Sequence, residues 1–424
     1  MANHSLRAIC FAHLVADSYF DPFLSYFQPT FTNFHPFLPF FYPFIRENPI
    51  LMAVCTYLQT TSEGVDLITA ETAPITELVA EHDSPAPHPA TKPPLNLALQ
   101  GGGAHGAFTW GVLDALLQDP RIAFEGISGS SAGAINAVVL ADGWLKNGRD
   151  GARKGLADFW SDIGQQLPPS VVKQGHSESI SLTPASKMLA NWAGQFSPYQ
   201  LNPLGLNPLR DVLKRQIDFE SLQKNSPFKL FVGTTQANTG KLRIFRENEL
   251  TVDVLLASSC LPKIHHAIEI DGEPYWDGGY TANPAVFPLF YDCDSADVLL
   301  VLLNPLLREG KLNTVEEIET RISDLAFSAN FMREMRMFTQ ATEFAGTGKL
   351  AQGWLEQRLK SIRFHMIDVN DLTSLERSDT KAIAHTPFLE LLRDQGSERG
   401  QEWLKAHASS IGEQGTLDVK KWFG

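Results

Sequence analysis

Two glycine-rich turns constrain the fold of this chain more than any other feature of its sequence. Each turn lies between a short apolar run with the pattern of a β-strand and a longer run with the pattern of a helix. The first turn follows residues 95–99 and the second follows residues 124–128. Further strand-like runs occupy residues 228–234, 242–245, 298–303 and 362–369. Strands that alternate with helices predict an α/β fold with a largely parallel sheet between helical layers.

Composition divides the chain into three parts. Residues 1–94 are rich in phenylalanine and then in proline, and we expect an N-terminal extension and linker that are poorly ordered in part. For the first 50 residues, a phenylalanine-rich interfacial anchor and translated upstream sequence before a start at Met52 are the alternatives. Residues 95–310 carry the strand–turn–helix pattern, with a helical insertion expected at about 148–227. Residues 311–424 have a mostly helical pattern, and we expect them to pack on the core. An apolar stripe in this part predicts a buried helix face, formed by Ile322, Leu325, Ala329, Met332, Met335 and Phe338. A methionine-rich surface for lipid contact is the alternative.

Charge and cysteine content exclude several classes of function. The 424 residues include 48 acidic and 35 basic side chains, a net charge of −13, which argues against a dedicated nucleic-acid-binding protein. Cys10, Cys55, Cys260 and Cys293 lie far apart, without the spacing of a zinc site or a disulfide framework. No apolar run reaches the ~18 residues of a membrane-spanning helix. We expect a cytoplasmic protein that can also contact a membrane surface.

The first glycine turn fits the pattern G-x-G-x-x-G through Gly101, Gly103 and Gly106, and Glu125 follows at the distance typical of a dinucleotide-binding fingerprint. Exposed backbone N–H groups at a helix N-terminus attract negative charge. That charge can be the pyrophosphate of a dinucleotide or the oxyanion of an acyl-transfer reaction. A tight turn that merely requires glycine is a third interpretation.

The second turn matches G-x-S-x-G, with Ser131 between Gly129 and Gly133. Its position between a strand and an apolar helix is typical of a nucleophile elbow, which projects the serine hydroxyl above the sheet edge. The alternative is that Ser130 or Ser131 is an ordinary helix N-cap.

The same two turns predict a set of oxyanion donors. The backbone N–H of Ala132 would supply one, and those of about Gly102 and Gly103 would supply others. Both turns can lie side by side at one edge of the sheet.

A serine hydroxyl needs an adjacent base, and Asp277 is the candidate. It ends the second strand of a predicted hairpin whose turn is Asp271-Gly272, so Asp271 itself is explained by the turn. Gly278 and Gly279 follow Asp277 and let backbone or substrate approach closely. A histidine base is the alternative, with His365, His385 and His407 in a Ser–Asp–His chain order and His105, His265 and His266 near the site segments.

Taken together, the three motifs resemble those of the patatin-like phospholipase family over roughly residues 95–310. The matching residues are Gly101, Gly102, Gly103, Ala104, His105, Gly106, Gly129, Ser130, Ser131, Ala132, Gly133, Asp277, Gly278 and Gly279. The resemblance implies a three-layer α/β/α sandwich with a mostly parallel central sheet, to which this chain adds a helical C-terminal extension. It also implies a Ser–Asp dyad, with Ser131 as nucleophile and Asp277 as base, and an oxyanion loop formed by Gly101, Gly102 and Gly103.

Two residues depart from the family pattern. Many members carry Arg or Lys where this chain has His105, and Asp is frequent where it has Gln100. Neither change removes a backbone donor.

The resemblance implies a serine acyl hydrolase that cleaves lipid esters through an acyl-enzyme, in the manner of a phospholipase A. A carboxylate with an ordinary pKa near ~4 is a weak base for serine, so the site must be dry. Candidates for the apolar shield are Ile127, Leu261, Ile264 and Trp276. This route needs no metal and no cofactor.

Two other functions remain open. One is a nucleotide-binding oxidoreductase that uses the glycine loop, and the other is a non-catalytic lipid-binding protein on the same fold. The expected partners are a lipid or acyl-ester substrate and, transiently, a membrane surface, but no nucleic acid.

Overall fold

The computed structural model describes residues 93–174, 180–307, 312–347 and 353–424. The described residues belong to one compact unit, which lies within Ser84–Gly424. The predictions for the N-terminal extension and linker fall on residues 1–92, outside the described residues.

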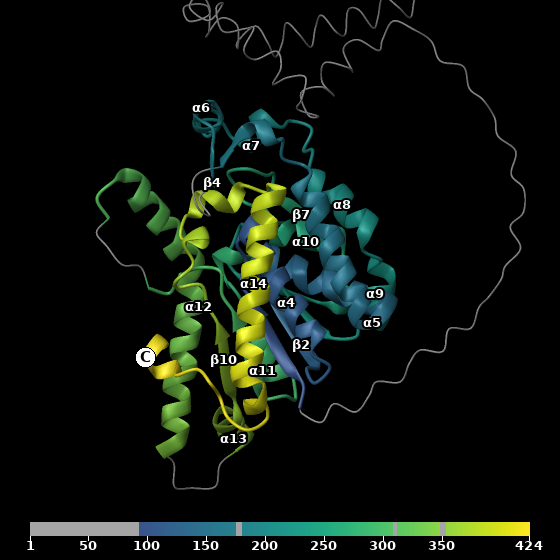
Figure 1. Ribbon diagram of the computed structural model, residues 1–424, viewed down its shortest axis with the longest axis vertical. Coiled ribbons are helices and arrows are strands. Elements are labelled where there is room, and N and C mark those ends of the chain that lie inside the picture. Colours follow the sequence, from purple (N-terminus) through teal and green to yellow (C-terminus); the bar gives the residue numbers. More distant parts are fainter. Residues whose placement is uncertain (1–92, 175–179, 308–311, 348–352) are drawn as a thin grey trace, which may run out of the picture. The chain divides into compact units, whose positions relative to one another are not determined.

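An eight-stranded sheet lies at the centre of the described unit (Figure 1). Its strands are β1 (Leu95–Leu99), β2 (Phe124–Ser130), β5 (Lys229–Gln236), β6 (Leu242–Arg246), β7 (Ile268–Ile270), β8 (Glu273–Asp277), β9 (Asp297–Val301) and β10 (Arg363–Ile367). Their order is β10-β9-β1-β2-β5-β8-β7, and β6 also pairs with β5. The five strands from β10 to β5 are parallel, whereas β6, β7 and β8 pair antiparallel.

Helices cover both faces of the sheet, so the predicted α/β/α sandwich is confirmed. Two consecutive residues of β9 point to opposite faces of the sheet, because Leu299 packs into one apolar cluster and Leu300 into the other. The first cluster includes α4 (Gly106–Gln118), α5 (Ala132–Gly164), α10 (Val252–Ser258) and α14 (Thr386–His407). The second includes α11 (Phe287–Asp292), α12 (Val315–Thr347) and α15 (Val419–Phe423), with α13 (Trp354–Ser361) beside α12.

The segment between β2 and β5 differs in detail from the expected insertion. Helix α5 continues to Gly164 across non-helical residues Asn147 and Gly148, so it forms two arms. A hairpin of β3 (Val172–Gln174) and β4 (Ile180–Leu182) follows. The remaining helices there are α6 (Pro184–Ala193), α7 (Pro198–Leu201), α8 (Pro208–Gln216) and α9 (Phe219–Asn225). Short 3-10 turns elsewhere are η2 (Gly103–His105), η3 (Pro169–Val171), η4 (Glu247–Glu249), η5 (Gly278–Tyr280), η6 (Thr373–Leu375), η7 (Ser378–Ala382) and η8 (Ala408–Ser410).

The C-terminal region is built into this sandwich. Strand β10 extends the sheet, and α14 lies directly on α4. The two helices approach so closely that a Cβ at Gly111 would overlap the carbonyl oxygen of Arg393. None of the described helices is both long enough and apolar enough to cross a bilayer.

The predicted apolar stripe of α12 is only partly buried. Met335 is fully buried, but Ile322 and Leu325 are exposed, so the prediction is wrong for the first half of the helix. Phe331 and Met335 pack against the sheet, whereas the earlier turns extend past it.

Candidate active site

Ser131 lies between the end of β2 and the start of α5, as a nucleophile elbow requires. Its backbone has φ 54° and ψ −126°, and among the described residues only one other non-glycine residue, Asp271, has a positive φ. Such a conformation is strained for a residue with a Cβ atom. Although Ser131 occupies the N-cap position of α5, its side chain makes no capping hydrogen bond. Helix capping therefore does not explain this serine.

The register of the sheet brings Ser131 and Asp277 together. Ser130, the last residue of β2, pairs with Gly233 of β5, and the next residue of β5, Thr234, pairs with Asp277 of β8. The two predicted residues therefore stand at the same end of three adjacent strands. The side chain of Ser131 lies near enough to the carboxyl group of Asp277 to lower its pKa.

Asp277 is buried, with only 1% of its surface exposed, whereas Ser131 is partly exposed. Oδ1 of Asp277 accepts a 2.8 Å hydrogen bond from the N–H of Gly279. Burial raises the pKa of Asp277 to about 7, and the hydrogen bonds from Gly279 and Ser131 act in the opposite direction. A reachable hydroxyl thus contacts a carboxyl group from which water is excluded.

The shield around this carboxyl group differs from the predicted one. Ile127 is fully buried, and Leu261 and Trp276 are half-buried. Ile264 is 54% exposed, so the expectation that it keeps the site dry is wrong. The ring of Phe327, from α12, lies against Gly279 and leaves no room there for a Cβ atom.

The glycine loop lies directly against the elbow. A Cβ at Gly101 would be 2.5 Å from the carbonyl oxygen of Ser130 and 2.8 Å from Cβ of Ser131, so only glycine fits there. The N–H groups of Gly102, Gly103 and Ala132 meet no hydrogen-bond acceptor within the described part of the chain. These three groups can receive an oxyanion next to the Ser131 hydroxyl.

Gly101 contributes differently, because its N–H already donates to Oδ1 of Asn283 at 2.7 Å. The amide of Gln100 lies beside this pair and donates to the carbonyl oxygen of Asn283 at 3.2 Å. Its Oε1 accepts from the N–H groups of Leu303 and Asn304. Asn283 and Gln100 therefore fix the base of the loop by buried hydrogen bonds.

Ser258, which ends α10, and Cys260, which follows it, hold Ser131 and Asp277 from the other side. The N–H of Ser131 donates to Oγ of Ser258 at 2.9 Å, and that hydroxyl donates to the carbonyl oxygen of Gly233 at 2.7 Å. The carbonyl oxygen of Cys260 accepts from the N–H of Asp277 at 2.8 Å. Burial, reinforced by the charge of Asp277, raises the pKa of the Cys260 thiol to about 12, so this thiol stays protonated at neutral pH.

The C-terminal region supports the outer side of the glycine loop. Gly103 has φ +57°, and the carbonyl oxygen of Lys381 lies where a Cβ would be. Nε2 of His105 is 2.7 Å from Oγ1 of Thr380, the neighbour of Lys381 in η7. The ammonium group of Lys381 lies 3.1 Å from Oδ1 of Asp324, on α12. Turn η7 therefore joins the loop to α12.

Histidine is the alternative base. Within the described residues, no hydrogen bond joins a histidine to Ser131 or Asp277. His365 contacts Asp297, at the start of β9 and thus at the opposite end of the sheet, and His266 contacts the carbonyl oxygen of Pro198. His385 and His407 flank the two ends of α14.

The acidic residue of the dinucleotide fingerprint is also at the wrong end of the sheet. Glu125 is the second residue of β2, whereas the glycine loop follows the last residue of β1, and these strands run parallel. Its carboxylate accepts from the N–H groups of Asp294 and Ser295 and pairs with Lys229. It cannot hold a ribose beside the glycine loop, which argues against the dinucleotide interpretation.

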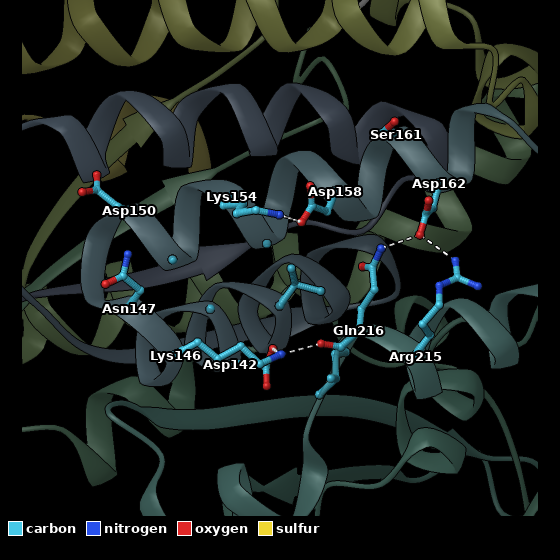
Figure 2. Close-up of a pocket in the computed structure, with 15 residues that line it drawn as sticks. Asp142, Lys146, Asn147, Asp150, Lys154, Asp158, Ser161, Asp162, Arg215 and Gln216 are labelled. Carbon is cyan, nitrogen blue, oxygen red and sulfur yellow. Dashed lines mark hydrogen bonds and ion pairs between the residues drawn. The ribbon is translucent and has the colours of Figure 1, made fainter. Parts of the chain in front are cut away.

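A cavity of about 610 Å³ lies away from these residues, between the two arms of α5 and the end of α8 (Figure 2). None of the predicted site residues lines it. Six of its charged side chains form ion pairs, which join Lys146 to Asp142, Lys154 to Asp158 and Arg215 to Asp162. The cavity therefore lies apart from both glycine-rich turns.

Sequence reasoning missed Asn283, Ser258 and Lys381. The Asn283-Pro284 pair soon after Asp277 is a turn signal that could have drawn attention to the first. Ser258 and Lys381 stand in ordinary helical patterns, and no local signal distinguishes them.

Comparisons with known proteins concern the same segment. Residues 97–290 match the family model of the patatin-like phospholipases. The chain is similar to the crystal structure of VipD from Legionella pneumophila, with 17% sequence identity and a TM-score of 0.37, over 74% of this chain and 67% of that chain. A comparison with curated protein sequences found no match. The family match contains the glycine loop, Ser131 and Asp277, so residues 97–290 of this chain resemble a patatin-like phospholipase domain.

Proposed function

We propose that this protein is a serine acyl hydrolase of the phospholipase A type, with Ser131 as nucleophile and Asp277 as base. The observation that carries the proposal is that the sheet register places Ser131, at a strained elbow, beside the buried carboxyl group of Asp277, whose pKa its side chain lowers. The patatin-like phospholipase domain supports a lipid ester as the substrate class.

Acylation begins when Oγ of Ser131 attacks the ester carbonyl carbon and its proton moves to Asp277. The N–H groups of Gly102, Gly103 and Ala132 receive the tetrahedral oxyanion. The intermediate collapses, the carbon–oxygen bond to the alcohol breaks, and the leaving oxygen takes the proton from Asp277.

Deacylation reverses these roles. Asp277 accepts a proton from a water molecule, whose oxygen attacks the acyl carbon. The bond to Oγ breaks, the fatty acid leaves, and Ser131 recovers its proton from Asp277.

The electrostatics of the site support Asp277 as this base. A carboxylate with a pKa of about 7 holds a proton far better at neutral pH than one with an ordinary pKa. The partly exposed Ser131 and the exposed Gly103 leave the nucleophile and an oxyanion donor open to an ester.

Substitution of the dyad tests the proposal. Ser131→Ala and Asp277→Asn should each lower kcat for a soluble p-nitrophenyl acyl ester by about 10³-fold or more, because the pair acts as one unit. Circular dichroism and thermal melting should show that both variants remain folded.

His385→Ala and His407→Ala are the matched controls, and both should retain substantial activity. If a histidine substitution abolishes hydrolysis while Asp277→Asn remains active, the dyad is wrong. A folded protein that hydrolyses no ester but binds lipid would instead support the non-catalytic alternative.

A further inference from the structure

We propose that a surface formed by residues 184–206 and the loop 261–267, here called the docking face, binds the surface of an anionic lipid bilayer. This inference rests on the proposed function, because a lipid-ester hydrolase must reach ester bonds that are held in a bilayer. It goes beyond that function by naming the part of the chain that makes the contact and the charge of the lipid it prefers.

The docking face exposes large apolar side chains that no described segment covers. Leu204 is 75% exposed and Met188 is 66% exposed. The other exposed apolar side chains of this face are Trp192, Tyr199, Leu201, Leu206 and Ile264. Exposed apolar residues that occur singly need no explanation, but a cluster of this kind marks an interaction surface.

Local structure holds these side chains outward. Met188 and Trp192 are four residues apart on α6 and therefore share one helix face. Nδ2 of Asn202 donates to the carbonyl oxygen of Leu206 at 2.7 Å, and its Oδ1 accepts from the N–H of Leu206 at 3.0 Å. These two hydrogen bonds close a turn with Leu204 near its tip. The apolar side chains are thus presented by a helix and a pinned turn.

The charge of the docking face identifies its partner. The whole chain has a net charge of −13, yet the described residues 180–206 and 259–267 contain Lys187 and Lys263 and no aspartate or glutamate. Apolar side chains beside lysines suit the interface of an anionic bilayer, where the side chains insert and the ammonium groups meet lipid head groups. A second copy of this chain fits less well, because the lysines of two such faces would repel each other.

Contacts connect the docking face to the dyad. The ring of Tyr199 stacks on that of His266 with centroids 4.0 Å apart, and its hydroxyl accepts from the N–H of Ala267 at 3.2 Å. The thiol of Cys260 donates to the carbonyl oxygen of His266 at 3.0 Å, and the carbonyl oxygen of Cys260 accepts from the N–H of Asp277. The loop that carries Ile264 therefore starts beside the site and ends against α7. In Figure 1, α6 and α7 lie at the top, with β7 and α10 close below them.

Vesicle binding by the full chain tests the proposal. The triple variant Met188→Ser, Trp192→Ser, Leu204→Ser should bind vesicles of phosphatidylcholine and phosphatidylglycerol at least about tenfold more weakly than the wild type, because less apolar area enters the interface. The variant Lys187→Glu, Lys263→Glu should lose the preference for these vesicles over phosphatidylcholine alone. Both variants should hydrolyse a soluble p-nitrophenyl ester at the wild-type rate.

The matched control removes exposed apolar side chains elsewhere, on α12 and α13, through Met337→Ser, Phe344→Ser and Leu355→Ser. This control should bind vesicles like the wild type. Wild-type vesicle binding by the Met188, Trp192 and Leu204 variant overturns the docking face, as does a wild-type dimer that this variant dissociates. A wild-type protein without soluble-ester activity overturns the proposed function instead, and vesicle binding is then judged by itself.

Discussion

At the scale of single residues, the pKa of Asp277 determines when the proposed dyad can work. Burial raises this pKa to about 7, in spite of hydrogen bonds from Gly279 and Ser131 that lower it. Only the ionised carboxylate can accept the proton of Ser131. The fraction of competent enzyme therefore falls as the pH falls below this pKa and is complete above it.

The pH dependence of hydrolysis follows from the ionisation of Asp277. We expect kcat/KM for a soluble ester to drop by about tenfold per pH unit below about pH 7 and to level off above it. A thermal melt at each pH separates this titration from unfolding. A level profile down to about pH 5 would show that the base has an ordinary carboxylate pKa or is not Asp277.

Asn283 is expected to position the oxyanion loop without touching substrate. Asn283→Ala removes the acceptor for the buried N–H of Gly101, and we expect kcat to fall by about 10²-fold with little change in KM. Asn96→Ala is the matched control, because buried Asn96 makes the same two kinds of hydrogen bond, to the N–H of Gly126 and to the carbonyl oxygen of Ser295.

The control lies near the start of β1, at the opposite end of that strand from the loop. Both substitutions should lower the free energy of unfolding by about 1–3 kcal/mol, since each leaves a buried N–H unpaired. Only Asn283→Ala should lower kcat at a temperature where both proteins are folded. Equal loss of kcat in the two variants would reduce Asn283 to a purely structural role.

The candidate site residues that could be predicted from the sequence are those that need particular neighbours in the chain. The elbow needs small residues around Ser131, and the loop needs glycine against it, so both leave motifs. Asn283 acts on Gly101 across 182 positions, and Ser258 acts on Ser131 across 127. Such roles arise from tertiary contacts and leave no spacing that a single sequence can reveal.

At the scale of elements, strands were easier to predict than helix ends and helix faces. Residues 298–303 form a run that is apolar at every position because β9 is covered on both sides. The range of α5, in contrast, holds two helical arms that meet at the non-helical residues Asn147 and Gly148, a break that was not predicted from the sequence. The predicted stripe of α12 is wrong for the first half of the helix because periodicity indicates which side of a helix is apolar, and not how much of its length the sheet covers.

The packing of α14 on α4 gives a prediction at this scale. Gly111→Ala should lower the free energy of unfolding by about 1–3 kcal/mol, because the new Cβ meets the backbone of α14 at Arg393 and cannot be relieved by a side-chain rotation. Chemical denaturation measures the change.

Gly155→Ala is the matched helical control. A Cβ there would lie 3.5 Å from its nearest neighbour, an ordinary contact, so the change should be neutral or stabilising by up to about 1 kcal/mol. Equal effects at the two positions would mean that α14 does not pack on α4 this closely.

At the scale of the whole molecule, the site depends on segments from most of the described chain. Parallel strands β1 and β2 lead into the glycine loop and the elbow, antiparallel β8 ends at Asp277, the proposed base, and η7 from the C-terminal region lies against Gly103. The sequence predicted the sandwich and the two turns, but not that residues beyond 311 would contact the glycine loop. That contact depends on the path of the chain after β9, which no local pattern specifies.

Labelling with a fluorophosphonate, followed by peptide mapping, tests most directly whether Ser131 is an activated nucleophile. We predict a single modified peptide that carries the label on Ser131, and a labelling rate that falls by about 10²-fold or more in Asp277→Asn. A label on another residue, or a rate that does not change in Asp277→Asn, would contradict the pairing of Ser131 with Asp277.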